Sequence, residues 1–364
     1  MKQRKTKIIH CLGSLHFGGI ERLVHDLVCE QLNRDYLEVS IGVNKYKGEF
    51  INEYQNLGVN IFDFKSHSGY DFNPLKIFRI YKIFIKFDVL HLHSFNLLIA
   101  IAALLSHKKI VYTEHGNFGF GRNLTISDKI MFFIRKMFFK YSKVQICANS
   151  NFTKNYLIKN FYSGDRLKLV YNGINSTEKI DNNLRKTLEN KYKNNFVIGT
   201  TSRLAGFKRI HKLIELFHLY RKRDINSILV IVGDGLLRKQ LEELVQNLKL
   251  ENSIYFEGFQ SDVSTYQSMF DVCVFPSENE PFGLVAVECF YLKKPVLVFA
   301  DGGGITEIIS KIEPKDICDN ENYMIQRLEY YKNNPFKWSN ELDDYIKLFS
   351  IKRMEEEYLN TYQS

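Results

Sequence analysis

Short apolar runs that end in turn residues alternate with helix-like segments, and this alternation constrains the fold more than any other feature. In the first half of the chain the apolar runs cover residues 7–15, 37–43, 89–94, 109–116 and 144–150. The segments between them have helical character and cover residues 19–32, 74–87, 97–106 and 127–142. Continuous apolar strands are typical of sheets buried on both faces. Their exchange with helices predicts a parallel sheet wrapped by helices.

The same alternation restarts after a polar interval, residues 172–195, which is rich in Asn and Lys and is predicted to be a linker. Strand-like runs then cover residues 196–204, 227–235, 253–259, 271–277 and 295–301. The clearest helices of this half cover residues 211–223 and 238–249. We therefore expect an α/β fold of two doubly wound, Rossmann-like domains facing a cleft.

The composition excludes several classes of protein. The chain has 364 residues, of which 45% are hydrophobic and 25% charged, as in a globular protein of about two domains. No window reaches about 18 uninterrupted apolar residues, so a transmembrane helix is not expected. The basic start reads as a first strand and not as a signal peptide, because His10 interrupts its apolar part. The six scattered cysteines are predicted to be reduced core residues of a cytosolic protein.

Basic charge is concentrated in the N-terminal half. Residues 1–180 carry 26 Lys and Arg against 14 Asp and Glu, a net charge of +12, whereas the whole chain carries +9. Residues 129–164 contain basic residues and no acidic one, so we expect a surface that attracts anions. The basic residues of this stretch are Lys129, Arg135, Lys136, Lys140, Lys143, Lys154 and Lys159.

Two of the predicted helical segments, residues 74–87 and 128–143, combine Lys and Arg with Ile and Phe. Basic amphipathic helices with aromatic residues can lie on anionic lipid, and we predict peripheral contact with an anionic membrane surface. The alternative is a pair of helices that pack on the sheet and expose a solvated basic face. Nucleic-acid binding is not expected, because no recognisable binding module is present.

Glycine-containing loops follow several predicted strands. In doubly wound sheets such loops meet anionic ligands through backbone amides and helix N-termini. Gly18 and Gly19 precede the first helix, but the third glycine of a dinucleotide fingerprint is absent. Arg203 and Lys208 lie in a second loop, after the strand-like run that begins at residue 196.

Two further loops belong to the second half of the chain. Gly233 lies in IVGDGLLRKQ, which lacks the Lys-Ser or Lys-Thr of a phosphate-binding P-loop. A three-glycine turn at residues 302–304 precedes a helix that contains Glu307. Each loop alone is weak evidence for a binding site.

Two glutamates, Glu280 and Glu288, are separated by seven residues in the segment SENEPFGLVAVECF. A helix is predicted to begin at Gly283, which would leave Glu280 in the loop and Glu288 about one and a half turns into the helix. Carboxylates suit neutral diols because each can accept from two donors. The alternative is a buried helix whose polar edges pair with Lys293 or Lys294.

These segments resemble, in order, the motifs of retaining glycosyltransferases of family 4, within the GT-B superfamily. The glutamate pair is similar to the family's E-x7-E signature, and SRLAGFK is similar to its phosphate loop. The other similar motifs are FGG with Glu21, DVLHLHS, TEHG, YNGI and GGGITE. The resemblance covers nearly the whole chain. It departs from the usual motifs at Ser202, Thr306 and Arg209.

The resemblance implies roles for individual residues. Glu280 would accept hydrogen bonds from sugar hydroxyls, Glu288 from the ribose, and His115 would donate to the sugar or its anomeric region. Without the resemblance, the favoured interpretation of His115 is a satisfied loop residue. The implied catalytic residues are Arg203, Lys208, Glu280 and His115. The implied substrate-binding residues are Gly18, Gly19, Glu288, Phe282, Gly283, Leu284, Gly233, Gly258 and Glu307.

The chemistry can also be argued from charge. Sugar transfer from a nucleotide diphosphate leaves negative charge on the departing diphosphate, so the site needs fixed cations there. Arg203 offers a fork to phosphate oxygens and Lys208 a point charge. The alternative is a solvated pair of loop cations. No D-x-D motif is apparent, so we expect a metal-independent enzyme without a cofactor, the nucleotide sugar being a substrate.

Retention of anomeric configuration, implied by the resemblance, requires a front-face displacement in which the leaving phosphate accepts the acceptor's proton. No protein nucleophile is then needed. His91 and His93 share one face of a strand and could form a metal pair. We expect structural histidines instead, because the sequence suggests no third ligand nearby.

The implied function is a hexosyltransferase-type enzyme that moves a UDP- or GDP-linked sugar to a hydroxyl of a bacterial-type surface polysaccharide or lipid-linked glycan. It would be cytoplasmic, peripheral on the inner face of the cytoplasmic membrane. Residues 335–362 resemble the family's C-terminal helix, which crosses back to the first domain. The expected domains are residues 1–175 with about 345–364, which bind the acceptor, and 176–344, which bind the nucleotide sugar. The alternative is an inactive GT-B scaffold or partner subunit.

Overall fold

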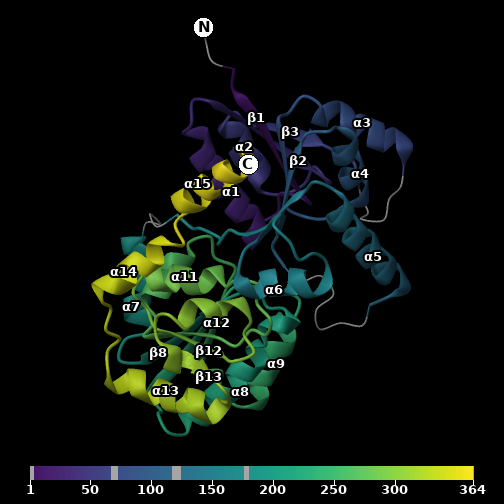
Figure 1. Cartoon of the computed structure of the whole chain (residues 1–364). Helices are drawn as coiled ribbons and strands as arrows, with labels where there is room; N and C mark the ends of the chain where they lie inside the picture. The colour runs from purple at the N-terminus through teal and green to yellow at the C-terminus, as the bar shows by residue number, and fades with distance from the viewer. Residues whose placement is uncertain (1–3, 67–72, 117–123, 176–179, 364) are drawn as a thin grey trace. The chain divides into compact units, whose positions relative to one another are not determined.

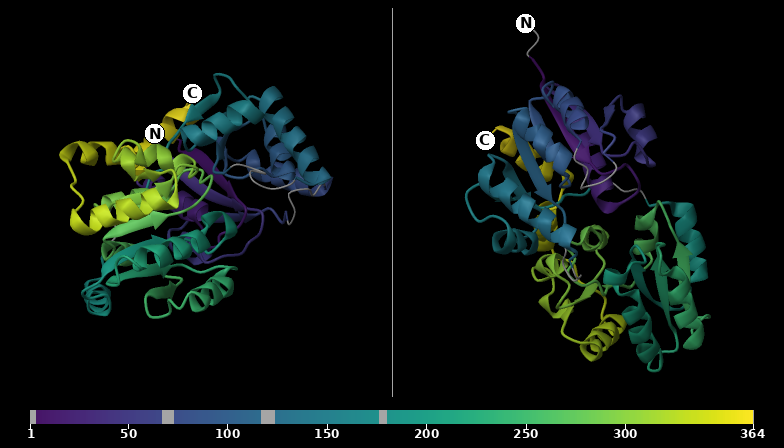
Figure 2. Two further views of the ribbon diagram at one scale, coloured as in Figure 1. Left: turned by 90° about the horizontal axis from the view of Figure 1, so that it is seen from below. Right: turned by 90° about the vertical axis from the view of Figure 1, so that its right-hand side faces the viewer.

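The computed structural model describes residues 4–66, 73–116, 124–175 and 180–363. The chain divides into two compact units. The first consists of residues 1–174 and 348–364, and the second of residues 175–347. Each unit is a parallel sheet with helices on both faces, so the predicted fold class of two doubly wound α/β units is confirmed (Figures 1 and 2).

The first unit contains a seven-stranded parallel sheet in the order β3-β2-β1-β4-β5-β6-β7. Its strands are β1 (Thr6–Leu12), β2 (Leu37–Val43), β3 (Asn60–Asp63), β4 (Val89–Leu92), β5 (Lys109–Glu114), β6 (Gln145–Ala148) and β7 (Leu167–Leu169). Its helices are α1 (Gly19–Leu32), α2 (Phe50–Asn56), α3 (Pro74–Phe84), α4 (Leu97–Leu105), α5 (Ile126–Tyr141), α6 (Asn151–Asn160) and α15 (Ile351–Gln363). The order of strands reverses between β1 and β4, which makes this pair the switch point of the sheet.

Helix ends in the first unit follow from local sequence. Asn73 caps α3 through its side chain, and Pro74 occupies the first turn, where a missing N–H costs nothing. Thr125 and Asp128 form a reciprocal capping box at the start of α5. The apolar sides of α3, α4 and α5 share one core with the sheet, and Figure 1 shows the three helices grouped on one side.

The second unit contains a six-stranded parallel sheet in the order β10-β9-β8-β11-β12-β13. Its strands are β8 (Phe196–Thr201), β9 (Ser227–Val232), β10 (Ile254–Gly258), β11 (Val272–Phe275), β12 (Val296–Phe299) and β13 (Ile317–Cys318). Its α-helices are α7 (Asn182–Lys191), α8 (Ile210–Arg221), α9 (Arg238–Asn247), α10 (Val263–Ser268), α11 (Leu284–Tyr291), α12 (Gly304–Ile309), α13 (Glu321–Asn333) and α14 (Asn340–Lys347). Here the order reverses between β8 and β11.

Several expectations need correction. The predicted linker, residues 172–195, is not all linker, because it contains α7, whose Leu188 is buried; residues 176–179 lie outside the described structure. Residues 335–362 form two helices, α14 in the second unit and α15 in the first, and not one. Arg135, counted in the basic stretch, is buried beside Glu114 and donates to the hydroxyl of Tyr112.

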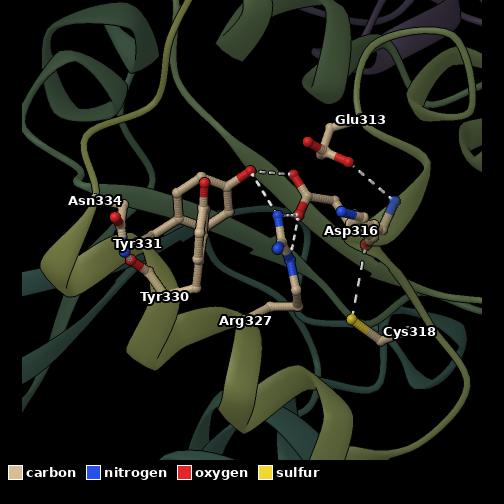
Figure 3. Close-up of polar contacts among 8 residues, drawn as sticks. Glu313, Asp316, Cys318, Arg327, Tyr330, Tyr331 and Asn334 are labelled. Carbon is tan, nitrogen blue, oxygen red and sulfur yellow. Dashed lines mark hydrogen bonds and ion pairs between the residues drawn. The ribbon is translucent and has the colours of Figure 1, made fainter.

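A buried ionic cluster supports the β13 edge of the second unit (Figure 3). Arg327 of α13 donates through Nε and one Nη to Asp316 Oδ1, at 2.9 and 2.7 Å. Tyr331, one turn further along α13, donates to Asp316 Oδ2 at 2.6 Å. Burial raises the pKa of Asp316 to about 6, so the carboxylate is ionised at neutral pH. The cluster therefore joins α13 to the turn that precedes β13.

No helix within the described residues is long and apolar enough to cross a membrane. All six cysteines are free thiols, and all but Cys29 are buried.

Candidate functional site

The loops that follow β8 and β11 flank the switch point of the second sheet. Ligands of doubly wound sheets bind outside the carboxyl ends of the strands at this point. Lys208 ends a short 3-10 turn after β8, and its Nζ lies 2.5 Å from Oε2 of Glu280 in the loop after β11. Both side chains are largely buried, with exposed fractions of 12% and 16%. The structure thus brings together two of the predicted catalytic residues.

The backbone of Glu280 is fixed by the three-glycine turn. Its N–H donates to the Gly302 carbonyl at 2.9 Å, and its carbonyl accepts from the Gly304 N–H at 2.7 Å. A Cβ on Gly303 would lie 2.8 Å from the Glu280 carbonyl oxygen, and Gly303 has φ +77°. Only glycine suits this position, because the conformation and the close approach both exclude a side chain. Backbone hydrogen bonds therefore join the loop after β11 to the loop after β12.

Arg209 joins the same loops and was not predicted as a site residue. Its guanidinium makes a two-pronged pair with Asp301, at 2.8 and 2.5 Å, and donates from Nε to the Pro276 carbonyl at 2.9 Å. The pairing lowers the pKa of Asp301, chiefly through the hydrogen bonds from Arg209. Arg209 adopts φ +48°, a conformation that costs a non-glycine residue energy, and the fork holds it there. Its signal in the sequence was the departure from the family motif after Lys208.

Glu288 lies on α11, about one turn after the helix begins at Leu284. Its Oε2 accepts from Nε2 of buried Gln267 at 3.3 Å, and the same Nε2 lies 3.0 Å from Oγ1 of Thr201 at the end of β8. No pattern in the sequence pointed to Gln267. The hydrogen bond orients Glu288 at the carboxyl edge of the sheet.

Arg203 is exposed after β8 and forms no ion pair with a described residue. Gly233 has φ +128°, and a Cβ there would lie 2.1 Å from the Ser202 carbonyl oxygen, so the loops after β8 and β9 touch through backbone alone. Thr306 replaces the family's usual Pro and donates to the Gly303 carbonyl at 2.7 Å. The side chain that departs from the motif at Thr306 therefore bonds within the three-glycine turn.

The remaining predicted binding residues of the second unit line the same edge. Gly283, with φ +98°, is the N-cap of α11, and no side chain caps this helix in the described structure. Phe282 is buried before it and Leu284 opens the helix. Gly258 ends β10, and Glu307 lies in the first turn of α12.

The first unit holds the other predicted residues. Gly18 is the N-cap of α1 and Gly19 its first residue, directly beyond the β1 loop. His115 follows β5 and is buried, and its Nε2 lies 2.9 Å from Nδ1 of His93. The structure places these residues at the carboxyl edge of the first sheet.

The sequence suggested no third ligand near His91 and His93, but the structure places one there. His10 of β1 joins them, with ring nitrogens of the three residues within 4.8 Å of one another. Both nitrogens of His91 are hydrogen bonded, to Tyr362 and to Thr113, each at 2.8 Å. Hydrogen bonds to protein groups therefore occupy both ring nitrogens of His91.

Burial lowers the pKa of His10 and of His115 from 6.5 to about 4. Such groups stay neutral in the folded state while the unfolded chain takes up protons below pH 6.5, so their contribution to stability is lost as the pH falls toward 4. We predict that each costs about 2 kcal/mol of unfolding free energy at pH 5 relative to pH 7.5. Urea unfolding at the two pH values should show a smaller loss in His10→Gln than in wild type. The control His211→Gln, at an exposed position, should match wild type. Equal losses in all three proteins would disprove the linkage.

Two family models cover most of the chain. The model described as Glycosyltransferase Family 4 matches residues 17–178, and the model described as Glycosyl transferases group 1 matches residues 181–347.

Relatives and solved structures agree with the models. An uncharacterized glycosyltransferase of Methanocaldococcus jannaschii is 28% identical over 353 residues, which span 85% of this chain and 86% of that protein. The O-antigen biosynthesis glycosyltransferase WclY of Escherichia coli is 24% identical over 56% of this chain and 57% of its own length. The crystal structure of Anabaena HepE with UDP and glucose has a TM-score of 0.82 at 20% identity, covering 99% of this chain and 100% of that one.

Proposed function

We propose that the chain moves a sugar from a nucleotide diphosphate sugar to an acceptor hydroxyl with retention of configuration, because it belongs to glycosyltransferase family 4 of the GT-B superfamily. The chain is a glycosyltransferase of surface polysaccharide biosynthesis, in keeping with relatives such as WclY. The donor, the stereochemistry and the acceptor belong to the proposal. A role as an inactive scaffold or partner subunit is not favoured by the comparisons.

The observation that carries the proposal is the Lys208–Glu280 pair at the switch point of the second sheet. In the absence of substrate the ammonium and the carboxylate neutralise each other in a largely buried place. An arriving diphosphate offers Lys208 a stronger partner, which releases Glu280 to accept from sugar hydroxyls. One exchange of partners then couples recognition of the phosphate to recognition of the sugar.

Each remaining residue serves one end of the donor. Arg203 is exposed in the same loop after β8 as Lys208 and can fork onto phosphate oxygens. Glu288, held by Gln267, accepts from the ribose hydroxyls. Negative charge that develops on the leaving diphosphate is met by Arg203 and Lys208, so catalysis needs neither a metal nor a cofactor. The leaving phosphate oxygen takes the acceptor's proton.

We propose UDP as the nucleotide, since HepE binds UDP and glucose, and a surface polysaccharide or lipid-linked glycan as the acceptor. The test is release of nucleoside diphosphate from a panel of UDP-, GDP- and ADP-sugars, with and without lipid-linked acceptors. Release of UDP from one UDP-hexose would support the proposal. A folded protein that releases nucleotide from no donor would favour the inactive scaffold, and release of GDP would correct the choice of base.

We further propose that the first unit contacts the cytoplasmic face of an anionic membrane. Ile126 and Phe133 on α5 are 79% and 61% exposed, and Phe78 on α3 is also exposed beneath the ammonium of Lys82, 4.5 Å from its ring centroid. Exposed apolar side chains next to lysines match a lipid surface that is apolar within and negative at its headgroups.

Sedimentation with liposomes tests this surface. The protein should co-sediment with anionic vesicles and be released by salt, because lysines supply part of the attraction. The double variant Ile126→Ser/Phe133→Ser should bind about tenfold more weakly, since it removes two apolar side chains that would be buried in the lipid. Ile225→Ser, at an exposed apolar position of the second unit, is the matched control. Equal binding to neutral vesicles at high salt would contradict the proposal.

A further inference from the structure

Four side chains in the first unit form an unbroken line of hydrogen bonds that ends at His115. Oε1 of Gln31, on α1, lies 2.9 Å from Nε2 of His10. Nδ1 of His10 lies 2.9 Å from Nε2 of His93, and Nδ1 of His93 lies 2.9 Å from Nε2 of His115. The three histidines belong to β1 and to the ends of β4 and β5, which are neighbours in the sheet, so the line crosses the sheet strand by strand.

The polarity of this line is determined at Gln31. A neutral imidazole has one N–H and one lone pair, and burial keeps the three rings neutral by lowering the pKa of each. The amide oxygen of Gln31 can only accept, so His10 carries its proton on Nε2 and accepts at Nδ1. His93 must then donate from Nε2 to Nδ1 of His10 and accept at its own Nδ1. His115 must in turn donate from Nε2 to Nδ1 of His93.

A second branch starts from the same amide. Nε2 of Gln31 donates to the hydroxyl of Tyr362 at 3.4 Å, which leaves that hydroxyl's proton for Nδ1 of His91. His91 then donates from Nε2 to Oγ1 of Thr113. Both branches therefore require the Nε2–H tautomer, which is also the form that an isolated histidine side chain prefers in water. If the oxygen and nitrogen of the Gln31 amide were exchanged, every ring would have to adopt the less stable Nδ1–H tautomer. Nδ1 of His115 would then be a buried N–H without a partner among the described residues, instead of a lone pair.

The line ends in an open acceptor. His115 is 8% exposed, and its Nδ1 is buried with no hydrogen-bond partner among the described residues. Elsewhere along the line each ring nitrogen is bonded. A buried polar atom without a partner costs free energy unless a ligand supplies one.

We propose that Gln31, His10 and His93 are positioning residues that lock His115 in the Nε2–H tautomer, so that its Nδ1 accepts a hydrogen bond from a hydroxyl of the bound sugar. This reverses the donating role that the family resemblance implies for His115. The ligand must then present an O–H at this point. The inference rests on the proposed function for its ligand, but the tautomer belongs to the free protein.

Nitrogen-15 NMR of the whole chain with selectively labelled histidine tests the lock directly. In wild type, His115 should show a protonated Nε2 and an unprotonated Nδ1, with the signals assigned by their loss in His115→Gln. Gln31→Met removes the amide oxygen that accepts from His10, so signals of the Nδ1–H form should appear at His115. Tyr362→Phe cuts the second branch alone and should leave His115 as in wild type.

Several results would overturn the lock. A proton on Nδ1 of His115 in wild type would do so even if Gln31→Met failed to fold. So would an unchanged spectrum in a folded Gln31→Met variant. Stoichiometric binding of added Zn²⁺ with shifts at His10, His91 and His93 would show that these rings are metal ligands instead. None of these measurements requires turnover, so they stand or fall apart from the proposed function.

A kinetic arm tests the ligand. Replacing one sugar hydroxyl of the active donor with fluorine removes a donor and keeps an acceptor, so wild type should show KM raised about tenfold at the position that faces His115. In the Gln31→Met variant the fluorinated donor should raise KM less, because His115 in the Nδ1–H tautomer no longer needs a hydroxyl that donates. An identical penalty in both proteins at every position would contradict the proposal.

Discussion

Replacing Lys208 with Met should lower kcat for nucleotide release from the active donor by about 10²–10³-fold. The reason is that Lys208 supplies a fixed positive charge at the switch point, where it lies 2.5 Å from Glu280 and is largely buried. A largely buried cation interacts more strongly with the departing diphosphate than an exposed one would, because little water screens the charges. Methionine keeps an unbranched side chain that is one heavy atom shorter and removes the charge.

The matched control for this substitution is Lys222→Met, an exposed lysine at the end of α8. It should retain wild-type turnover, since it lies outside the loops that follow β8 and β11. Melting temperatures of both variants would show that each is folded. Full activity of a folded Lys208→Met protein would remove Lys208 from the mechanism.

Replacing Asp316 with Ala should destabilise the second unit by about 3–5 kcal/mol, the usual cost of leaving one partner of a buried ion pair uncompensated. Arg327 is nearly buried, and both of its described hydrogen bonds to a carboxylate go to Asp316 (Figure 3). Tyr331→Phe removes one hydrogen bond from the same carboxylate and should cost about 1–2 kcal/mol.

Urea unfolding at pH 7.5 measures both values. The control is Glu329→Ala on the same helix, α13, where the pair with Arg223 is exposed on both sides and should contribute less than about 1 kcal/mol. If Asp316→Ala proved no more costly than Glu329→Ala, the cluster would not be what holds the β13 edge.

The two doubly wound units could be predicted from the sequence because their central strands are buried on both faces and read as continuous apolar runs. The edge strands β3, β7 and β13 were not identified, since they are only four, three and two residues long. Helix α7 was missed because only Leu188 of its residues is buried, so its sequence resembles a polar linker.

The candidate site was predictable as separate loops but not as contacts. Lys208 and Glu280 are 72 residues apart, and their pairing depends on β8 and β11 being adjacent in the sheet. Arg209 looked only like a departure from a motif, although it joins two loops through Asp301 and Pro276.

The histidine line was out of reach of sequence patterns for the same reason. Gln31 and His10 come from α1 and β1, far along the chain from His93 and His115, and only the parallel order of β1, β4 and β5 brings the rings into register. A pattern of alternating residues can indicate that histidines share a face, but it gives no bonding partner.

The central claim is that the loops of the second sheet hold a nucleoside diphosphate through Lys208 and Glu288. Titration calorimetry with UDP and GDP tests it most directly, in wild type, Lys208→Met, Glu288→Gln and Lys222→Met. The account predicts that UDP binds wild type and Lys222→Met with the same Kd, and that each of the other two variants binds about tenfold or more weakly. One affinity shared by all four proteins, or no binding of either nucleotide to wild type, would contradict it.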